Sequence, residues 1–539
     1  MRFMRPARSS LGAAILGVCL LVVGPGAGGS ASAYLSCLAN VEIRLCIDLE
    51  EGGVITYLAR TGDSESVVND HDLGRQVNQS YYAGPTPYGQ PQRVPGHPWN
   101  PNGAGDDYGN ASRVVSFSND GREIYVKSIP MQWALDDVPC ECTFEHWITL
   151  NGNAVHVRNR LTTSRSDKTL YPAYGQELPA VYTTGRYFRL FAYSGSEPYT
   201  GGPLTEVPLP PWVGVPVGAT EHWAALVDDG GYGLGVLNPD VTRVISAFFG
   251  EEPCDCGPKD NPTGYMSPVT EAIIDPEAVY EYRYDLVLGT LSQIREFAVS
   301  NRPPDRRPDW HFERDRQGWS YWNAVDLRYP PDGALHVSLE REDPYLIAPQ
   351  QTWQARDVPR IYIRAALHGS NGRAQVFWEP AGADGFSERE SLFFEMTPDG
   401  RFHTYAVDLA ASPEYRGVIT RFRLDPSDGG APGASLDLDW VSWKTARHAR
   451  TVSLRLTGRL VASGRVAVAD AYGVCNPAPV RIERRVSGRW VRAAPAFTDF
   501  RGVYRVRLRD RPGTYRAVAR EVVAENEICA AAVSPPRRR

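Results

Sequence analysis

Residues 69 to 107 concentrate side chains that can do chemistry. Within a glycine- and proline-rich stretch the chain gathers carboxylates, amides, aromatic rings, an arginine and a histidine. These are Asp70, Asp72, Arg75, Gln79, Tyr81, Tyr82, His97, Trp99, Asn100, Asp106 and Asp107. Aromatic faces suit the apolar side of a pyranose ring, and amides and carboxylates suit its hydroxyls. The segment therefore predicts a saccharide site. The alternative is that Asp70 and Asp72 form turns and Arg75 only neutralises them.

A pair of carboxyl groups is the second chemical signal. Glycoside hydrolysis commonly uses one protonated carboxyl group to assist the leaving oxygen, and one carboxylate as base or nucleophile. We expect Asp72 and Glu177 to be this pair, with Arg75 keeping Asp72 ionised. For Glu177, an exposed glutamate at a strand end is the alternative. Because the separation of the two groups is unknown from sequence, retention and inversion both stay open.

The remaining substrate-binding candidates share polar or aromatic side chains near these two groups. They are Asp70, Arg75, Gln79, Tyr82, His97, Trp99, Asn100, Asp106, Glu221 and His222. Trp99 is the expected sugar platform. An epimerase-type mechanism would instead use a histidine as acid and a glutamate as base. His97 and His222 are candidates for it, whereas His146 shares a strand face with Phe144 and Ile148 and is expected to pack in a core.

Several other chemistries lack their motifs. The sequence has no G-x-S-x-G elbow, no H-E-x-x-H zinc helix, no phosphate-binding glycine loop and no Rossmann glycine pattern after a strand. We therefore expect no nucleotide cofactor and no resident metal. Acidic loops suit calcium, and Asp106 with Asp107, or Asp437 with Asp439, could bind it, although neither forms a complete motif.

The first residues indicate the compartment. Three arginines precede the apolar run 11–23, and the small residues 31–33 offer a cleavage site. The run is shorter than the roughly 20 residues that span a bilayer. We expect a cleaved leader at residues 1–33 and a secreted, extracellular protein without a membrane span. Losing the three arginines changes the net charge from −6 to −9. Nucleic acid is therefore excluded as a partner, since polyphosphate requires a basic surface.

Eight cysteines follow the leader, in four local groups: Cys37 and Cys46, Cys140 and Cys142, Cys254 and Cys256, and Cys475 and Cys529. An even number in an exported chain favours disulfides. We expect the first and last groups each to close on themselves, and two bridges to tie the two C-x-C segments to each other. A four-thiolate metal site at the C-x-C segments is the alternative.

The elements that must position these residues are mainly strands. Hairpin signals at 119–121, 151–152 and 229–231 separate alternating apolar runs, which predicts antiparallel sheets. The long loops 80–109 and 197–216 favour a functional role, because loops of that length are uncommon in compact domains. One helix is expected near 290–300, where Leu291, Ile294, Phe297 and Ala298 keep helical spacing.

Proline- and charge-rich breaks divide the chain. The expected parts are a β-sandwich domain at 34–300, a linker at 301–308, a second β module at 309–446, a third at 451–530 and a tail at 531–539. The strand spacing of the second part suits a jelly roll, and that of the third suits a small immunoglobulin-like sandwich. The fold class is therefore all-β.

Particular segments of the first part resemble a known superfamily. They are Gly52-Gly53-Val-Ile-Thr-Tyr57, Asn69 to Tyr82, Gln176-Glu177-Leu-Pro-Ala-Val-Tyr182, Arg189 to Gly195, Glu221-His222-Trp223 and Gly231 to Val236. Together they look like galactose-mutarotase-like β-sandwich domains of secreted bacterial carbohydrate-active proteins. The resemblance implies a large supersandwich that binds glycans across one sheet face. Members include sugar epimerases, polysaccharide lyases and glycosidase-associated domains, so no single enzyme is implied.

The second part is similar to jelly-roll, carbohydrate-binding-like modules. The residues that carry this similarity are Asp343-Pro344, Gln375 to Trp378, Arg421 to Pro426 and Asp437 to Trp440. Two functions follow from the residues and the resemblances. The first is an enzyme of the glycoside hydrolase or polysaccharide lyase kind, with its site in residues 34–300. The second is a non-catalytic extracellular glycan-binding or cell-envelope protein.

Overall fold

The computed structural model describes residues 34–369, 371–444, 447–458, 460–469, 475–509, 511–524 and 527–539. Within these ranges the chain is almost entirely antiparallel β-sheet, and its one α-helix is α1 (Leu291–Ser300). The predicted all-β sandwich class is confirmed. The predicted leader, residues 1–33, lies outside the described residues. No helix in these ranges is both long and apolar enough to cross a membrane.

Three antiparallel sheets build the first domain. A small sheet holds β1 (Leu35–Ala39), β2 (Ile43–Asp48) and β3 (Val54–Arg60). The nine-stranded sheet runs in the spatial order β13 (Thr205–Val207), β12 (Arg189–Ala192), β15 (Trp223–Val227), β16 (Tyr232–Leu237), β19 (Val279–Thr290), β10 (Ala154–Thr163), β9 (Cys142–Asn151), β7 (Glu123–Ile129) and β6 (Arg113–Asn119). The seven-stranded sheet runs in the order β14 (Val217–Gly218), β17 (Arg243–Phe249), β18 (Thr263–Ala272), β11 (Tyr174–Thr184), β4 (Asn78–Ser80), β5 (Pro101–Asn102) and β8 (Met131–Gln132).

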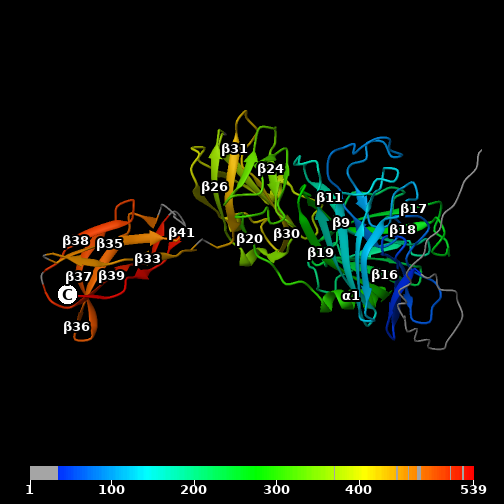
Figure 1. Cartoon of the computed structure of the whole chain (residues 1–539), viewed down its shortest axis with the longest axis horizontal. Helices are drawn as coiled ribbons and strands as arrows, with labels where there is room; N and C mark the ends of the chain where they lie inside the picture. Colours follow the sequence, from blue (N-terminus) through cyan, green and yellow to red (C-terminus); the bar gives the residue numbers. More distant parts are fainter. Residues whose placement is uncertain are drawn as a thin grey trace, which may run out of the picture.

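The core of the first domain lies between the two large sheets. Alternate residues of each strand enter it, such as Ile124 and Val126 of β7, while Tyr125 between them is half-exposed. The three predicted hairpins are confirmed, since they join β6 to β7, β9 to β10 and β15 to β16. Figure 1 shows these strands in the blue to green lobe at the right.

Helix α1 is the predicted helix. Thr290 caps it, and Gln293 completes a capping box by accepting from the Thr290 backbone N–H. Its buried face, Ile294 and Ala298, packs with Trp223 on the outer side of the nine-stranded sheet. The helix therefore covers one end of that sheet's outer face.

The second domain is a sandwich of two six-stranded antiparallel sheets around its own core. One sheet contains β22 (Val325–Arg328), β23 (Leu335–Ser338), β31 (Ser435–Ser442), β26 (Ile361–His368), β29 (His403–Val407) and β20 (Asp309–His311). The other contains β21 (Ser320–Trp322), β24 (Tyr345–Ile347), β30 (Val418–Asp425), β27 (Arg373–Pro380), β28 (Ser391–Glu395) and β25 (Trp353–Gln354). Short 3-10 turns occur at η1 (Ala355–Asp357), η2 (Glu388–Glu390) and η3 (Leu409–Ala411).

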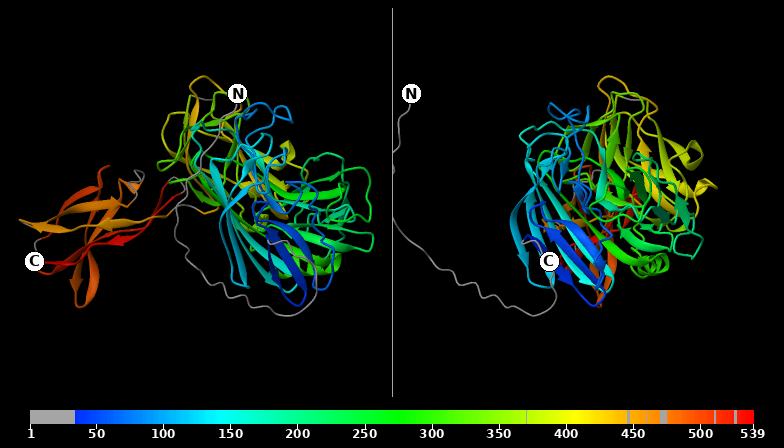
Figure 2. Two further views of the ribbon diagram at one scale, coloured as in Figure 1. Left: turned by 45° about the vertical axis from the view of Figure 1, so that its right-hand side comes forward. Right: turned by 90° about the vertical axis from the view of Figure 1, so that its right-hand side faces the viewer.

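The third domain has a separate small core. Its sheets contain β32 (Arg447–His448), β41 (Glu527–Cys529) and β40 (Val522–Ala524); then β33 (Arg450–Val452), β35 (Val461–Val468), β34 (Arg455–Thr457) and β38 (Val503–Arg507); and finally β37 (Arg489–Phe497), β36 (Pro479–Val486), β39 (Thr514–Ala519), β42 (Ala532–Val533) and β43 (Arg537–Arg538). Figure 1 and the left view of Figure 2 show this orange and red domain standing clear of the first.

The disulfides differ in part from the expectation. Cys37–Cys46 and Cys475–Cys529 form as predicted. The two bridges expected between the C-x-C segments are wrong, because each segment closes on itself, as Cys140–Cys142 and Cys254–Cys256. The first pair lies at the start of β9 in the nine-stranded sheet, and the second lies in the loop between β17 and β18 of the other sheet. The two segments therefore belong to opposite layers of the sandwich.

Buried ion pairs join the first two domains. Arg316 of the second domain binds Asp275 of the first, with Nη1–Oδ2 at 2.6 Å and Nη2–Oδ1 at 3.0 Å, and it also binds Asp326 at 2.6 Å. The three side chains are buried. Because buried charges must be paired to avoid a large desolvation penalty, this contact fixes one domain against the other.

Nearby polar contacts extend the same interface. Glu379 receives Arg243 of the first domain and Arg421 of its own, each at 3.2 Å, and Arg421 also reaches Glu271 of the first domain at 3.1 Å. The Gln350 side chain accepts from the Thr242 backbone N–H at 2.7 Å. The orientation of the two domains is therefore specified at several points.

Arg316→Met should lower the free energy of unfolding by about 3–5 kcal/mol, because it leaves Asp275 and Asp326 buried without their cation. Denaturant unfolding measures the change. The control is Arg360→Met, which removes a half-exposed pair with Asp408 and should cost at most about 1 kcal/mol. Equal effects of the two substitutions would contradict the interface argument.

Candidate active site

A cavity of about 640 Å³ opens on the outer face of the seven-stranded sheet. Its floor comes from Ser80 of β4, Glu177 and Tyr182 of β11, and Phe249 of β17. Loops supply the walls. The complete lining is Asp72, Leu73, Gly74, Arg75, Ser80, Tyr82, Arg93, His97, Asn100, Asn102, Asp106, Asp107, Tyr108, Gly109, Trp133, Glu177, Ala180, Tyr182, Val213 and Phe249. The two predicted catalytic carboxyl groups therefore line one cavity.

Glu177 lies where β11 changes register. Its pairing with β18 shifts between Glu177 and Val181, and its pairing with β4 shifts between Glu177 and Ala180. Such irregularities redirect a side chain relative to the regular alternation. The shift lets Leu178 and Val181 enter the main core while Glu177 and Tyr182 line the cavity.

Burial raises the pKa of Glu177, and the Tyr82 hydroxyl partly offsets this by donating to its Oε1 at 3.1 Å. The neighbouring Gln176 side chain fixes Tyr82, because it accepts from the Tyr82 N–H at 2.9 Å and donates to the Tyr82 carbonyl at 2.8 Å. Glu177 therefore stays protonated to a higher pH than a free glutamate. A carboxylic acid of this kind can donate a proton.

Asp72 and Arg75 also line the cavity. Arg75 Nε is 3.3 Å from Asp72 Oδ2, and Arg75 also donates to the Asn261 side chain at 2.8 Å. The pKa of Asp72 is nevertheless raised, because desolvation by burial outweighs the attraction of Arg75. This direction is the reverse of what the arginine pairing alone predicts. Arg75 orients Asp72 more than it lowers its pKa.

His97 is held by Asn100. Asn100 donates through Nδ2 to Ser80 Oγ and to the Tyr81 carbonyl, so its Oδ1 accepts from His97 Nε2 at 3.1 Å. The neutral ring then carries its proton on Nε2 and a lone pair on Nδ1. Burial lowers the pKa of His97. Its ring lies 5.0 Å from that of Trp133.

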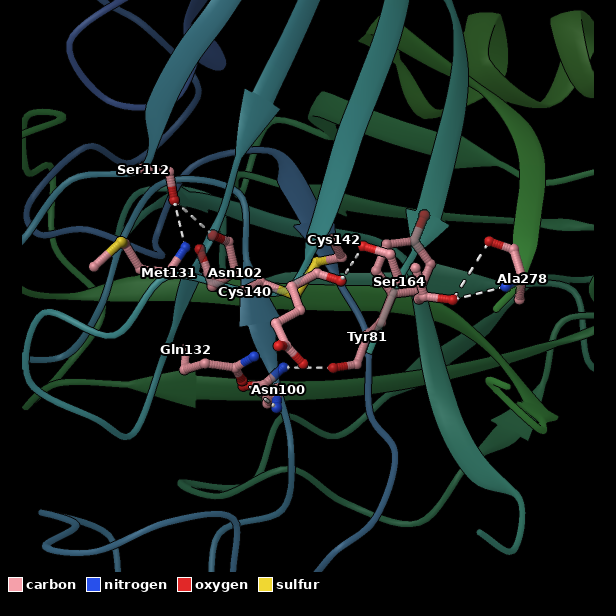
Figure 3. Close-up of a disulfide and its surroundings, with 12 residues drawn as sticks. Tyr81, Asn100, Asn102, Ser112, Met131, Gln132, Cys140, Cys142, Ser164 and Ala278 are labelled. Atoms are coloured by element: carbon pink, nitrogen blue, oxygen red, sulfur yellow. Dashed lines mark hydrogen bonds between the residues drawn. A yellow bond between two sulfur atoms is a disulfide. The ribbon is translucent and has the colours of Figure 1, made fainter. Parts of the chain in front are cut away.

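A disulfide-braced turn supports this wall. Figure 3 shows the Cys140–Cys142 bridge near Tyr81, Asn100 and Gln132. The Cys140 N–H donates to the Pro130 carbonyl at 2.8 Å, which closes the turn. Gln132 Oε1 accepts from the Asn100 N–H at 3.1 Å. The bridge thus stabilises the segment that positions Asn100 and, through it, His97.

Three residues predicted for substrate binding lie away from the cavity in the same part of the chain. Trp99 is fully buried in the main core, so its ring has no free face for a sugar. Gln79 is also buried, where it donates to the Glu145 carbonyl and accepts from Tyr81. Asp70 is bound by Gln76 at 3.0 Å and by Lys259. Asp70 is therefore held by neighbouring side chains and does not line the cavity.

Two further candidates lie beneath α1. Glu221 is fully buried and bound by Arg295 at 2.8 Å and by the Trp223 indole N–H at 3.1 Å. His222 is buried beside it, and burial lowers its pKa to about 4. The core position expected for His146 is confirmed. Glu221 and His222 are therefore buried side chains that do not line the cavity.

Asp106 lines the cavity but its oxygens are committed to the loop. It accepts from the backbone N–H of Tyr108, Asn110 and Asp137 and from the Asn110 amide, each at 2.8–2.9 Å. Asp437 is likewise bound by His336 and His368. Among the described residues no group of three His, Cys, Asp or Glu side chains could hold a metal ion. Calcium at these positions stays a prediction.

The sequence interpretation missed several lining residues. Tyr182, Trp133, Arg93, Tyr108 and Phe249 all face the cavity. Tyr182 has a detectable signal, because it follows Glu177 in the same strand. Trp133 and Phe249 come from segments distant in sequence, and only the folded sheet brings them to this site.

No family model and no curated protein matches the chain. Solved structures with some likeness include a galactose mutarotase-like protein from Lactobacillus casei, with 12% identity and a TM-score of 0.30 over 47% of this chain and 99% of that one. A galactose mutarotase related enzyme from Lactobacillus acidophilus has 11% identity and a TM-score of 0.30 over 47% of this chain and 97% of that one.

A putative mutarotase from Salmonella typhimurium has 10% identity and a TM-score of 0.30 over 48% of this chain and 90% of that one. The sandwich fold is defined by the strand pairings of the chain itself.

The pKa values of two histidines should be shifted in opposite directions. His97 should titrate below the ordinary value of 6.5, because burial disfavours its cation. His156 should titrate above it, because Asp285 accepts from its Nδ1 at 2.6 Å. Histidine NMR signals followed from pH 4 to 9 measure both pKa values. Asn100→Ala should lower that of His97 further and leave that of His156 unchanged. A His97 pKa at or above the ordinary value would contradict the geometry.

Proposed function

We propose that the protein is a secreted enzyme that acts on an oligosaccharide or polysaccharide by carboxyl acid–base chemistry, as a glycoside hydrolase or a lyase-like enzyme does. The observation that carries the proposal is that Asp72 and Glu177 line one cavity with amide and aromatic side chains. A saccharide site requires this combination. The leader-like first residues and the disulfides support secretion.

Glu177 is the proposed general acid. Its raised pKa keeps the carboxyl proton that a leaving glycosidic oxygen requires. Asp72, oriented by Arg75, is the proposed base or nucleophile in the same cavity. The adjacent Arg75 guanidinium favours the ionised form of Asp72, which a base or nucleophile requires. The two carboxyl groups thus divide the roles by environment, as in many glycosidases.

A second reaction uses Glu177 with His97. The neutral His97 ring has a lone pair on Nδ1, and it lines the same cavity as the protonated Glu177. One base and one acid at a sugar are the requirements of epimerase-type proton transfer. This candidate conserves the substrate's size, whereas hydrolysis and elimination both shorten it.

The test is a screen of the mature protein against a polysaccharide panel. New reducing ends without an unsaturated product indicate hydrolysis, and new reducing ends with an unsaturated product indicate elimination. A change of anomeric or epimeric ratio without cleavage indicates the His97 reaction. Binding without any product would support the non-catalytic glycan-binding alternative. If the protein neither binds nor converts any member of the panel, the proposal is contradicted.

Glu177→Gln and Asp72→Asn should each reduce turnover by at least about a hundredfold, because a positioned acid or base contributes that much. Both changes nearly preserve shape, so melting temperatures should stay close to wild type. Initial rates on the substrate found in the panel measure the effect. Glu50→Gln, an exposed carboxyl away from the cavity, is the matched control and should keep full activity. Full activity of both cavity variants would refute the assignment.

Tyr82→Phe should move the alkaline limb of the pH–rate profile to higher pH. The Tyr82 hydroxyl stabilises the Glu177 carboxylate and so lowers the pKa; its removal raises that pKa. A general acid is active while protonated, and its activity is lost as pH rises through its pKa. Tyr174→Phe, which loses a hydroxyl contact to Thr86 outside the cavity, should leave the limb in place. A shift to lower pH would reverse the assigned role.

A further inference from the structure

The loop between β13 and β14, residues 208–216, continues the edge of the seven-stranded sheet to the cavity. The Phe248 N–H donates to the Pro210 carbonyl at 2.8 Å, and the Gly214 N–H donates to the Ser246 carbonyl at 3.2 Å. The loop therefore runs along β17 towards Phe249. Val213 of the loop and Phe249 of the strand both line the cavity.

The tip of this loop exposes apolar side chains. Trp212 is 67% exposed, the largest value for any tryptophan of the described residues, and Val213 and Val215 are 44% and 83% exposed. Exposed apolar area costs about 25 cal/mol per Å² relative to burial. Large apolar groups left together at the rim of a cavity commonly mark a binding surface.

The loop is also pre-organised. Four of its nine residues are proline, namely Pro208, Pro210, Pro211 and Pro216, and each fixes its own φ angle. Arg243 anchors the end of the loop, because its Nη2 donates to the Pro216 carbonyl at 3.3 Å and to the Asp384 carbonyl of the second domain at 3.2 Å. A ring presented on a rigid loop loses little conformational entropy when a ligand binds.

We propose that Trp212 forms a second saccharide subsite outside the cavity, so that the ligand is a chain of at least two sugar units and not a single sugar. The inference rests on the proposed saccharide function of the cavity. The cavity supplies hydrogen-bonding groups and the carboxyls, whereas the loop supplies an aromatic face for the next unit of the chain. The loop then binds the additional sugar unit of a longer substrate, whereas the reaction takes place at Glu177 and Asp72.

The experiment compares chain-length dependence. Cello-, malto-, xylo- and manno-oligosaccharide ladders, from monosaccharide to hexasaccharide, are titrated by calorimetry into the full mature protein. Wild type should bind the longer members of one ladder at least about tenfold more tightly than its monosaccharide, which is about 1.4 kcal/mol. Trp212→Ala should remove this gain and leave monosaccharide affinity unchanged. Trp212→Tyr, which keeps an aromatic face, should retain most of it.

Phe500→Ala is the matched control, because Phe500 is 84% exposed on the third domain and far from the cavity in sequence. It should retain the full length dependence. Glu177→Gln should lose turnover but keep the gain with length, which separates the subsite from the catalytic proposal. If wild type binds and Trp212→Ala keeps the gain, the subsite is refuted while the cavity proposal stands.

Two other outcomes also overturn the subsite. If wild type binds no member of any ladder, both the saccharide function and the subsite fail. If sedimentation shows that wild type self-associates and that Trp212→Ala is monomeric with unchanged saccharide affinity, then the exposed ring serves contact between two copies of the chain.

Discussion

The pairing of β11 with two different neighbours constrains the whole site. β18 on one side and β4 on the other both pair with it, and both ladders shift register beside Glu177. The extra residues let one strand serve two purposes, since Leu178 and Val181 fill the core while Glu177 and Tyr182 face the cavity. A regular strand would place residues 177, 179 and 181 on one face. The irregularity after Glu177 therefore lets Tyr182 line the same cavity as Glu177 while Leu178 and Val181 enter the core.

Much of the architecture follows from local sequence. Hairpin turns between alternating apolar runs predicted antiparallel sheets, and the spacing of Leu291, Ile294 and Ala298 predicted α1. These features depend on neighbours within a few residues, which a sequence displays directly. The same holds for Asp72, Arg75 and Tyr82, which are close in sequence and line one cavity.

Other parts of the site could not be inferred, because they depend on which side of a loop faces the core. Trp99 and Asn100 are adjacent, yet one lies in the core and the other holds His97 at the cavity. The amino-acid composition of the loop is the same whichever of its side chains face the core. Glu221 looked like a cleft residue, but Arg295 of α1, distant in sequence, neutralises it under the helix. The C-x-C cysteines were misassigned for a related reason, since the topology assigns them to opposite sheets.

The ion pairs between the first and second domains determine where a ligand bound to the second domain would lie relative to the cavity. A flexible tether would let the second domain sample a volume set by linker length, and the effective concentration of its cargo at the cavity would fall as the linker lengthened. The Arg316–Asp275 ion pair and the contact of Glu379 with Arg243 instead hold the two sandwiches in one relative orientation. A ligand bound to the second domain would then lie at one fixed distance from the cavity.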